Sequence, residues 1–299
     1  MVYQKLAKKV PNSLPTKSNP WKRLVVFFFL ISLLFLFSRH LSSTPSQIRS
    51  GLSSIIAPTP TPWKPIENYQ PPLIKQSDSY TILFVGDSMT EALGPNFDEL
   101  RKDLTVYYPQ KVFGLFNYGF GSTNIFTVDK RLHETTQYNG QTFPPILGRY
   151  SDIVIIESFA YNPLSEYPLQ QGLIMQNETL NKIVYDIVSS KPNTLIIFLA
   201  TIAPSKKFFG QGSVALSPEK RRQWAEERIA YLENHITYAQ NHHIPLINVY
   251  EKSLDKNGEA NLKYINSNNY IHPSAAGIQL ISQTIADYFH TNNLLPITP

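Results

Sequence analysis

Five runs of consecutive apolar residues constrain the fold of this chain most strongly. They are "YTILFVG" (80–86), "VFGLFNYG" (112–119), "DIVIIESF" (152–159), "TLIIFLAT" (194–201) and "IPLINVY" (244–250). Continuous Val, Ile, Leu and Phe, without strict alternation, are typical of strands buried on both faces. Helical patterns at 91–103, 173–190, 218–241 and 275–292 separate or follow these runs. The sequence therefore predicts an α/β fold with three layers, an open parallel sheet of about five strands covered by helices on both faces.

Glycine and polar residues follow the first three predicted strands, and a histidine precedes the last predicted helix. Ser88 follows the first strand, Gly121 the second and Asn162 the third, while His272 lies just before residue 275. In open parallel sheets, ligands bind outside the carboxyl ends of the strands. Ser88 alone is equally well explained as a helix N-cap, because serine is a preferred cap. The other residues, at neighbouring strand ends, favour a catalytic site.

These four blocks, in this order, resemble those of the SGNH or GDSL hydrolase superfamily. The first block of that family, Gly-Asp-Ser-x-(Thr/Ser), matches "GDSMT" (86–90) fully. The last block, Asp-x-x-His-Pro, matches "NYIHP" (269–273) except that Asn269 replaces the aspartate. The glycine and asparagine blocks match Gly121 and Asn162 more loosely. The resemblance covers residues 80–289 and implies a flavodoxin-like SGNH hydrolase fold for a catalytic domain at 76–295.

The resemblance implies a serine esterase that hydrolyses carboxylic esters. Ser88 would be the nucleophile and His272 the general base and then the general acid. The oxyanion hole would consist of the backbone N–H groups of Ser88 and Gly121 and the side-chain amide of Asn162. Asp87 is expected to hold the turn and to take no part in catalysis. The resemblance implies neither a metal nor an organic cofactor.

Asn269 is the one departure that bears on the chemistry. In a Ser-His-acid triad the carboxylate holds the histidine tautomer and stabilises the imidazolium. Three interpretations remain open at this stage. Asn269 orients His272 through its amide oxygen in a Ser-His pair, another acceptor such as a backbone carbonyl or Asp255 takes that role, or the site is weakened.

The N-terminal part has the composition of a membrane anchor and a linker. Residues 1–75 hold 10 of the 27 Lys and Arg residues and one of the 22 Asp and Glu residues, which leaves residues 76–299 with a net charge of −4. A mildly acidic domain argues against nucleic-acid binding. Residues 24–41 are mostly apolar and follow a basic tail at 1–23, a pattern that predicts a single-pass signal anchor with a cytoplasmic N-terminus. Residues 42–75, rich in Pro, Ser and Thr, predict a linker.

A cleaved signal peptide is the alternative for residues 24–41, although no small-x-small cleavage site follows them. With the anchor, the catalytic domain is expected outside the cytoplasmic membrane, near O-acylated envelope glycans or lipids as ester substrates. Two other functions use the same residues. One is O-acyl transfer to envelope sugars, and the other is carbohydrate binding by a catalytically weakened SGNH-like protein.

Overall fold

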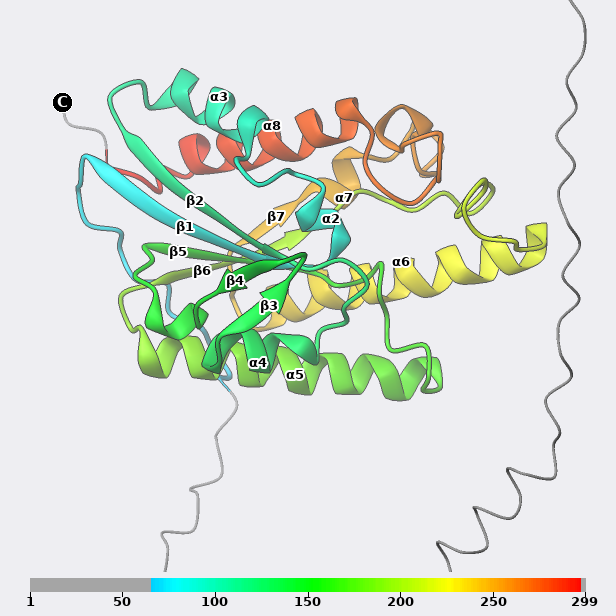
Figure 1. Ribbon diagram of the computed structural model, residues 1–299, viewed down its shortest axis with the longest axis horizontal. Helices are drawn as coiled ribbons and strands as arrows, with labels where there is room; N and C mark the ends of the chain where they lie inside the picture. Colours follow the sequence, from blue (N-terminus) through cyan, green and yellow to red (C-terminus); the bar gives the residue numbers. More distant parts are fainter. Residues whose placement is uncertain (1–65, 297–299) are drawn as a thin grey trace, which may run out of the picture. The chain divides into compact units, whose positions relative to one another are not determined.

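A computed structural model describes residues 66–296 of the chain (Figure 1). The predicted basic tail at 1–23, the predicted anchor at 24–41 and most of the predicted linker at 42–75 lie outside the described residues. Between residues 66 and 296, none of the helices combines the length and the apolar character needed to cross a bilayer.

The predicted parallel sheet is confirmed and has five strands. They are β1 (Ser79–Gly86), β2 (Val112–Gly119), β5 (Ile153–Glu157), β6 (Leu195–Ala200) and β7 (Leu246–Asn248). All neighbouring strands pair in parallel, in the order β2-β1-β5-β6-β7. This is the flavodoxin-like order, in which the chain reverses its direction across the sheet between β1 and β5. Ligands of such sheets bind at this switch point, just where Ser88 and Asn162 follow their strands.

Helices cover both faces of the sheet, which confirms the three-layer architecture. Figure 1 shows α3 (Asp98–Tyr107) and α8 (Ala275–Thr291) on one face, and α4 (Thr127–His133), α5 (Leu169–Ser190) and α6 (Pro218–Asn241) on the other. All residues of β5 and β6 are buried between these layers. The short elements α2 (Ser88–Glu91), α7 (Val249–Lys252), η1 (Ile146–Gly148) and η2 (Leu262–Tyr264) lie in the connections.

The helix expected at 91–103 is wrong in its bounds, because two helices occupy this region. The one-turn helix α2 ends at Glu91, and α3 begins only at Asp98. Gly94 has a φ of 81°, which suits glycine, and Pro95 has no N–H to donate to a continuing helix. Phe97 then enters α3 in the left-handed region with a φ of 52°.

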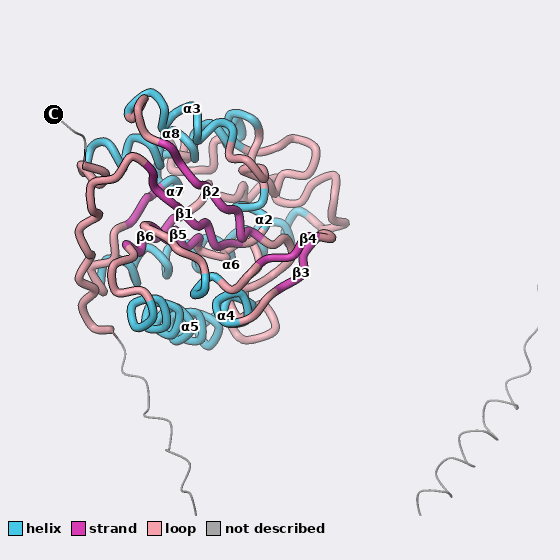
Figure 2. Tube along the Cα trace, turned by 60° about the vertical axis from the view of Figure 1, so that its left-hand side comes forward, coloured by secondary structure: helices cyan, strands magenta, loops and turns pink. Residues whose placement is uncertain are grey.

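A small antiparallel hairpin, absent from the expected elements, lies beside α2 in Figure 2. It consists of β3 (Thr136–Tyr138) and β4 (Gln141–Phe143), joined by Asn139 and Gly140. Both turn residues have a positive φ, 47° and 74°. A two-residue Asn-Gly loop of this kind is the common type I′ hairpin turn. The dipeptide is therefore a signal from which the hairpin could have been predicted.

The folded part begins before residue 76, within the segment expected to be a linker. Tyr69 is buried, and its hydroxyl accepts a hydrogen bond from Ile196 N at 2.8 Å. The backbone N–H of Tyr69 donates to His242 O at 2.9 Å. Proline-rich composition suggested an extended segment, and these contacts attach its last ten residues to β6 and the end of α6.

Candidate active site

The turn that carries Ser88 depends on a glycine and an aspartate. A Cβ atom on Gly86 would lie 2.0 Å from Thr90 Oγ1, so only glycine fits at the end of β1. Asp87 is the N-cap of α2, and its Oδ1 accepts a hydrogen bond from Met89 N at 2.8 Å. Ser88, half-buried, is thereby placed at the first position of α2.

Asn162 lies beside this turn, as the sequence predicted from its place after the third long strand. Its Nδ2 donates to Asp87 Oδ2 at 2.9 Å, a contact across 75 positions of sequence. An amide nitrogen carries two hydrogens, so one stays available after this bond is made. Asp87 thus holds both the Ser88 turn and the Asn162 amide, which agrees with the structural role expected for it.

Three charged side chains are fully buried under the Ser88 turn, and two of them were not singled out from the sequence. Asp87 is 0% exposed, and Glu157 at the end of β5 and Arg131 of α4 are each 1% exposed. Arg131 Nη1 donates to Gly86 O and Tyr118 O, both at 2.7 Å. The guanidinium therefore joins the ends of β1 and β2.

Burial dominates the electrostatics of this cluster. It raises the pKa of the Glu157 carboxyl well above its usual range, and the nearby Asp87 carboxylate raises it further. The pKa of Asp87 is also raised by burial, against the lowering effect of its hydrogen bonds to Met89 and Asn162 and of the Arg131 charge. Burial lowers the pKa of Arg131 to about 10. Besides Asp87, the glutamate near the end of the apolar run 152–159 was the sequence signal of this cluster.

Gly121, the predicted oxyanion glycine, lies next to Ser88 but its N–H already has an acceptor. A Cβ on Gly121 would lie 3.6 Å from Ser88 Cβ, 2.6 Å from Glu91 Oε2 and 2.9 Å from the Tyr138 hydroxyl. Its N–H donates to the Tyr138 hydroxyl at 2.8 Å, and that hydroxyl donates to Glu91 Oε1 at 2.9 Å. Tyr138 and Glu91 were not predicted from the sequence, since the first belongs to the unforeseen hairpin.

The predicted pair of Asn269 and His272 is close in space, but the amide presents its nitrogen to the ring. Asn269 Oδ1 accepts hydrogen bonds from the backbone N–H groups of Ile271 at 2.9 Å and His272 at 3.0 Å. Because these partners can only donate, the oxygen must face them, and Nδ2 faces His272 Nδ1 at 3.1 Å. In this arrangement Nδ1 accepts and the neutral ring carries its proton on Nε2. The expected bond from the ring N–H to the amide oxygen is not formed.

Asp255, the other acceptor considered for His272, serves its own loop. Its Oδ1 accepts hydrogen bonds from Asn257 N at 2.8 Å and Glu259 N at 3.1 Å. Within residues 66–296, hydrogen bonds join His272 to Asn266 and Asn269 but not to Asp255 or Ser88.

The loop between β6 and α6 links the His272 segment to the strand ends. The Phe208 ring stacks on Tyr270 with centroids 5.3 Å apart, and the Phe209 ring lies 6.0 Å from Tyr161, the neighbour of Asn162. Gly210 N also donates to Tyr270 O at 3.3 Å. Figure 1 shows α2, this loop and the segment before α8 on the same side of the sheet, at the carboxyl ends of the strands.

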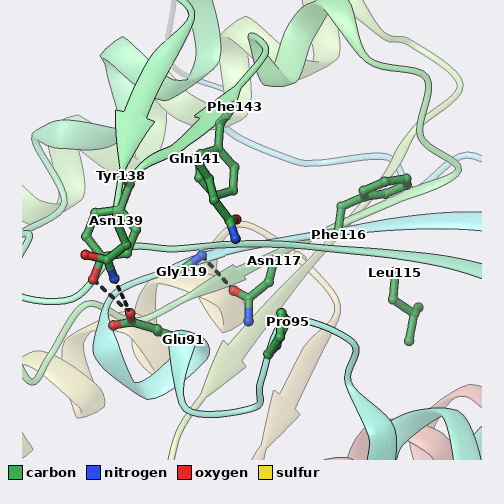
Figure 3. A pocket seen from close by; sticks show the side chains of 10 residues that line it. All are labelled: Glu91, Pro95, Leu115, Phe116, Asn117, Gly119, Tyr138, Asn139, Gln141 and Phe143. Atoms are coloured by element: carbon green, nitrogen blue, oxygen red, sulfur yellow. Dashed lines mark hydrogen bonds between the residues drawn. The ribbon is translucent and has the colours of Figure 1, made fainter.

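A cavity of about 310 Å³ opens beside the Ser88 region (Figure 3). It lies between the end of β2, the segment after α2 and the β3–β4 hairpin, and Glu91 and Tyr138 form part of its wall. The complete lining is Glu91, Pro95, Leu115, Phe116, Asn117, Gly119, Tyr138, Asn139, Gln141 and Phe143.

One group of side chains in the described part has the composition of a metal site, and it is occupied by a lysine. Asp129, His133 and Asp186 place their ligand atoms within 4.8 Å of one another. Lys182 Nζ lies 2.6 Å from Asp129 Oδ1 and 2.7 Å from Asp186 Oδ2. The ammonium group forms an ion pair with each carboxylate, so we interpret this group as an ion-pair cluster between α4 and α5.

Solved structures with the same fold are GDSL-type hydrolases. A candidate GDSL-like lipase of Parabacteroides merdae aligns over 75% of this chain and all (100%) of its own, with a TM-score of 0.53 and 16% identity. A GDSL-like lipase of Bacteroides thetaiotaomicron aligns over 71% and 89%, with a TM-score of 0.50 and 12% identity. A candidate acylhydrolase of Bacteroides fragilis aligns over 71% and 88%, with a TM-score of 0.50 and 15% identity.

No family profile matches the sequence, and no curated protein matches it either. The resemblance to the SGNH or GDSL hydrolases that the four blocks indicated is thus confirmed in the fold. The chain has the GDSL hydrolase fold, and Ser88 stands where its first strand meets its first helix.

Proposed function

We propose that this chain is a serine esterase that hydrolyses O-acyl esters, O-acetyl esters among them. The observation that carries the proposal is the hydrogen bond between Asp87 and Asn162, which sets an amide donor beside Ser88 at the switch point of a GDSL-type sheet. The backbone N–H of Ser88, at the first position of α2, is the second donor at the same place.

In the proposed reaction, Ser88 Oγ attacks the acyl carbonyl carbon while His272 Nε2 takes the hydroxyl proton. The carbonyl oxygen becomes an oxyanion near the Ser88 N–H and the free hydrogen of the Asn162 amide. The bond to the alcohol oxygen then breaks, and His272 returns the proton to that oxygen. Water attacks the acyl-serine by the same route, which releases the carboxylic acid and restores Ser88.

Asn269 imposes a cost on this reaction. With the amide N–H directed at Nδ1, the ring proton resides on Nε2, where it blocks acceptance of the Ser88 proton. The proton has to move to Nδ1 first, against an amide nitrogen that cannot accept it. We therefore propose a Ser-His pair that turns over more slowly than a triad with aspartate at position 269.

Covalent labelling tests the nucleophile. A fluorophosphonate probe should label the parent chain at Ser88, as read by mass spectrometry of the modified peptide, because only an activated serine attacks such a probe rapidly. Ser88→Ala should lose the label. As a matched control, Ser274→Ala removes a cap serine at the start of α8 that has no proposed catalytic role and should keep it. Equal labelling of the Ser88→Ala variant and the parent would exclude the proposed mechanism.

We also propose that residues 24–41 anchor the chain in a membrane with the esterase domain outside the cytoplasm. The support is the charge pattern, with six basic residues at 1–23 ahead of the apolar run. A reporter that is active only outside the cytoplasm, fused after Pro299, should be active. If only a cytoplasmic reporter is active in that position, the proposed location is excluded. A mature chain that begins near residue 42 would instead indicate a cleaved signal.

A further inference from the structure

The Tyr138 hydroxyl occupies the position that an oxyanion would take at Gly121. Gly121 N lies 2.8 Å from this hydroxyl, which is the distance at which an oxyanion-hole donor binds its oxygen. The hydroxyl oxygen and Ser88 Cβ both lie within 3.6 Å of the point where a Cβ on Gly121 would sit. An ester oxygen and the Tyr138 oxygen therefore compete for the same N–H next to the nucleophile.

Glu91 holds Tyr138 in this position. Its Oε1 accepts hydrogen bonds from the Tyr138 hydroxyl at 2.9 Å and from Asn139 Nδ2 at 3.1 Å, as the dashed lines in Figure 3 show. The Tyr138 ring stacks on Phe120 with centroids 4.5 Å apart and an interplanar angle of 10°. A carboxylate that accepts from one hydroxyl can equally accept from another, so this bond is exchangeable.

The cavity next to Tyr138 gives a ligand access to the Glu91 carboxylate. Glu91 forms part of its wall, and the side chains of Asn139 and Gln141 bring amide groups to the same wall. Phe116 and Phe143 supply aromatic surface (Figure 3). Carboxylate, amides and aromatic rings together suit a neutral, polyhydroxylated group, which needs both hydrogen-bond acceptors and apolar contact.

We propose that Glu91 is a specificity-determining residue that accepts a hydroxyl of the alcohol half of the ester, which displaces Tyr138 and frees the Gly121 N–H for the oxyanion. The inference rests on the proposed esterase function. It predicts that esters of polyhydroxylated alcohols, such as acylated sugars, are hydrolysed faster than esters of simple alcohols with the same acyl group. Simple esters bind while Tyr138 still blocks one donor of the oxyanion hole.

Two acetyl esters with primary alcohols of equal chain length provide the test. Glycerol 1-monoacetate carries two hydroxyls in its alcohol part, and propyl acetate carries none. For the parent, kcat/KM should be at least about tenfold higher for the glycerol ester, the order expected for one exchanged hydrogen bond to a charged group. Tyr138→Phe should raise kcat/KM for propyl acetate by about tenfold and leave the glycerol ester nearly unchanged, so that the preference disappears.

Two further variants complete the design. Glu91→Ala should remove the preference as well, because it removes the acceptor for both Tyr138 and the substrate hydroxyl. Tyr150→Phe is the matched control, since Tyr150 donates to the Asp152 carboxylate at 2.6 Å at the amino end of β5, the opposite edge of the sheet. It should leave both rates unchanged.

Two results would overturn the inference while the esterase stands. A loss of activity on both esters in a folded Tyr138→Phe variant would make Tyr138 a donor to the oxyanion, and an unchanged preference would make it irrelevant. In both cases the parent still hydrolyses the esters through Ser88, so the proposed function stands. If instead no variant hydrolyses either ester and no variant is labelled at Ser88, the proposed function fails and the inference fails with it.

Discussion

The turn that carries Ser88 and the loop that carries His272 are held by different kinds of contact. The Ser88 turn lies on the central sheet, above three buried charged groups, and Asp87 joins it to the segment after β5. The His272 loop is held mainly by nearby residues, since Asn269 bonds to Ile271 and His272, and Asn266 N donates to His272 O at 2.8 Å.

This difference separates the part of the proposed site that is organised for catalysis from the part that is not. The amide donor beside Ser88 is oriented by a buried carboxylate that cannot relax into water. The histidine is oriented by a half-buried amide whose oxygen already accepts from the backbone. The amide nitrogen, which cannot accept a proton from the ring, therefore faces His272 Nδ1. The free energy of unfolding should therefore depend mainly on the Ser88 turn. The catalytic rate should be limited mainly by the His272 loop.

Loss of the proposed nucleophile or of the proposed base should have the largest effect. Ser88→Ala and His272→Ala should each reduce kcat for a short acetyl ester by about 10⁴-fold or more, because the two groups act as a unit. Titration of released acid measures the rate, and circular dichroism checks the fold. Substantial turnover in folded His272→Ala would mean that the base lies elsewhere. The His272 loop would then have no part in catalysis.

Removal of the buried cation should have the largest effect on stability. Arg131→Met leaves the Asp87 and Glu157 carboxyls without their positive neighbour, and the free energy of unfolding should fall by about 3–5 kcal/mol. Urea unfolding measures it. Arg228→Met is the comparison variant, because Arg228 is also buried in a helix but forms its ion pair with the half-buried Glu227, donates to Trp224 O and packs over the Phe209 ring.

The comparison variant should lose less, about 1.5–3 kcal/mol, the value of a hydrogen bond to a charged group. If both arginine variants lose the same stability, the charge cluster under Ser88 contributes nothing special. If Arg131→Met does not fold, Arg131→Lys, which keeps the charge, should fold with part of the loss restored.

Replacement of Asn269 by aspartate should give the His272 ring the acceptor that it lacks. The difference between the two regions should then disappear. A carboxylate accepts the backbone N–H groups of Ile271 and His272 and also the Nδ1–H of the ring, so Nε2 becomes free to take the Ser88 proton. We expect kcat/KM to rise about 10- to 100-fold at neutral pH. The gain should vanish at low pH, where the ring is protonated before the ester binds.

Asn269→Ala serves as the reference for that variant. It removes the interfering amide without adding a charge and should give a smaller change than aspartate. Equal rates for the parent and both variants across the pH profile would mean that position 269 does not set the histidine tautomer.

A last prediction concerns the pH dependence of stability under Ser88. The pKa of Glu157 is raised in the folded state, so the folded chain holds a proton that the unfolded chain releases above its usual pKa of 4.5. Stability from this group is present below pH 4.5 and is lost as pH rises toward the folded pKa, by up to about 1.4 kcal/mol per pH unit.

Glu157→Gln should weaken this dependence, so the variant should gain stability relative to the parent between pH 4.5 and 7.5. Urea unfolding at both pH values measures the difference. Glu134→Gln, at an exposed position after α4, is the control and should show no such trend. A pH-independent difference for Glu157→Gln would show that the buried pair does not titrate in this range.

Several features of the fold and site could be predicted from the sequence because they depend on local pattern. Continuous apolar runs required strands buried on both faces. The strand predicted at 112–119 has the predicted bounds, and the other four differ from their predicted bounds by one to four residues. Gly86, Asp87 and Ser88 required a tight turn after the first strand. The hairpin was missed even though Asn139 and Gly140 form a two-residue turn signal, because its strands are only three residues long.

The sequence by itself determined which residues follow the strands at the carboxyl edge of the sheet, since buried apolar runs separated by helical patterns indicate parallel strands. Only the tertiary structure decided how their polar atoms pair. Asn269 has an oxygen and a nitrogen at nearly the same place, and two backbone N–H groups selected the oxygen. Gly121 has one N–H, and the fold brought Tyr138 to it from 17 positions away. Each N–H hydrogen makes one full hydrogen bond, so the groups that remain for a substrate depend on which neighbours in the folded chain already pair with each atom.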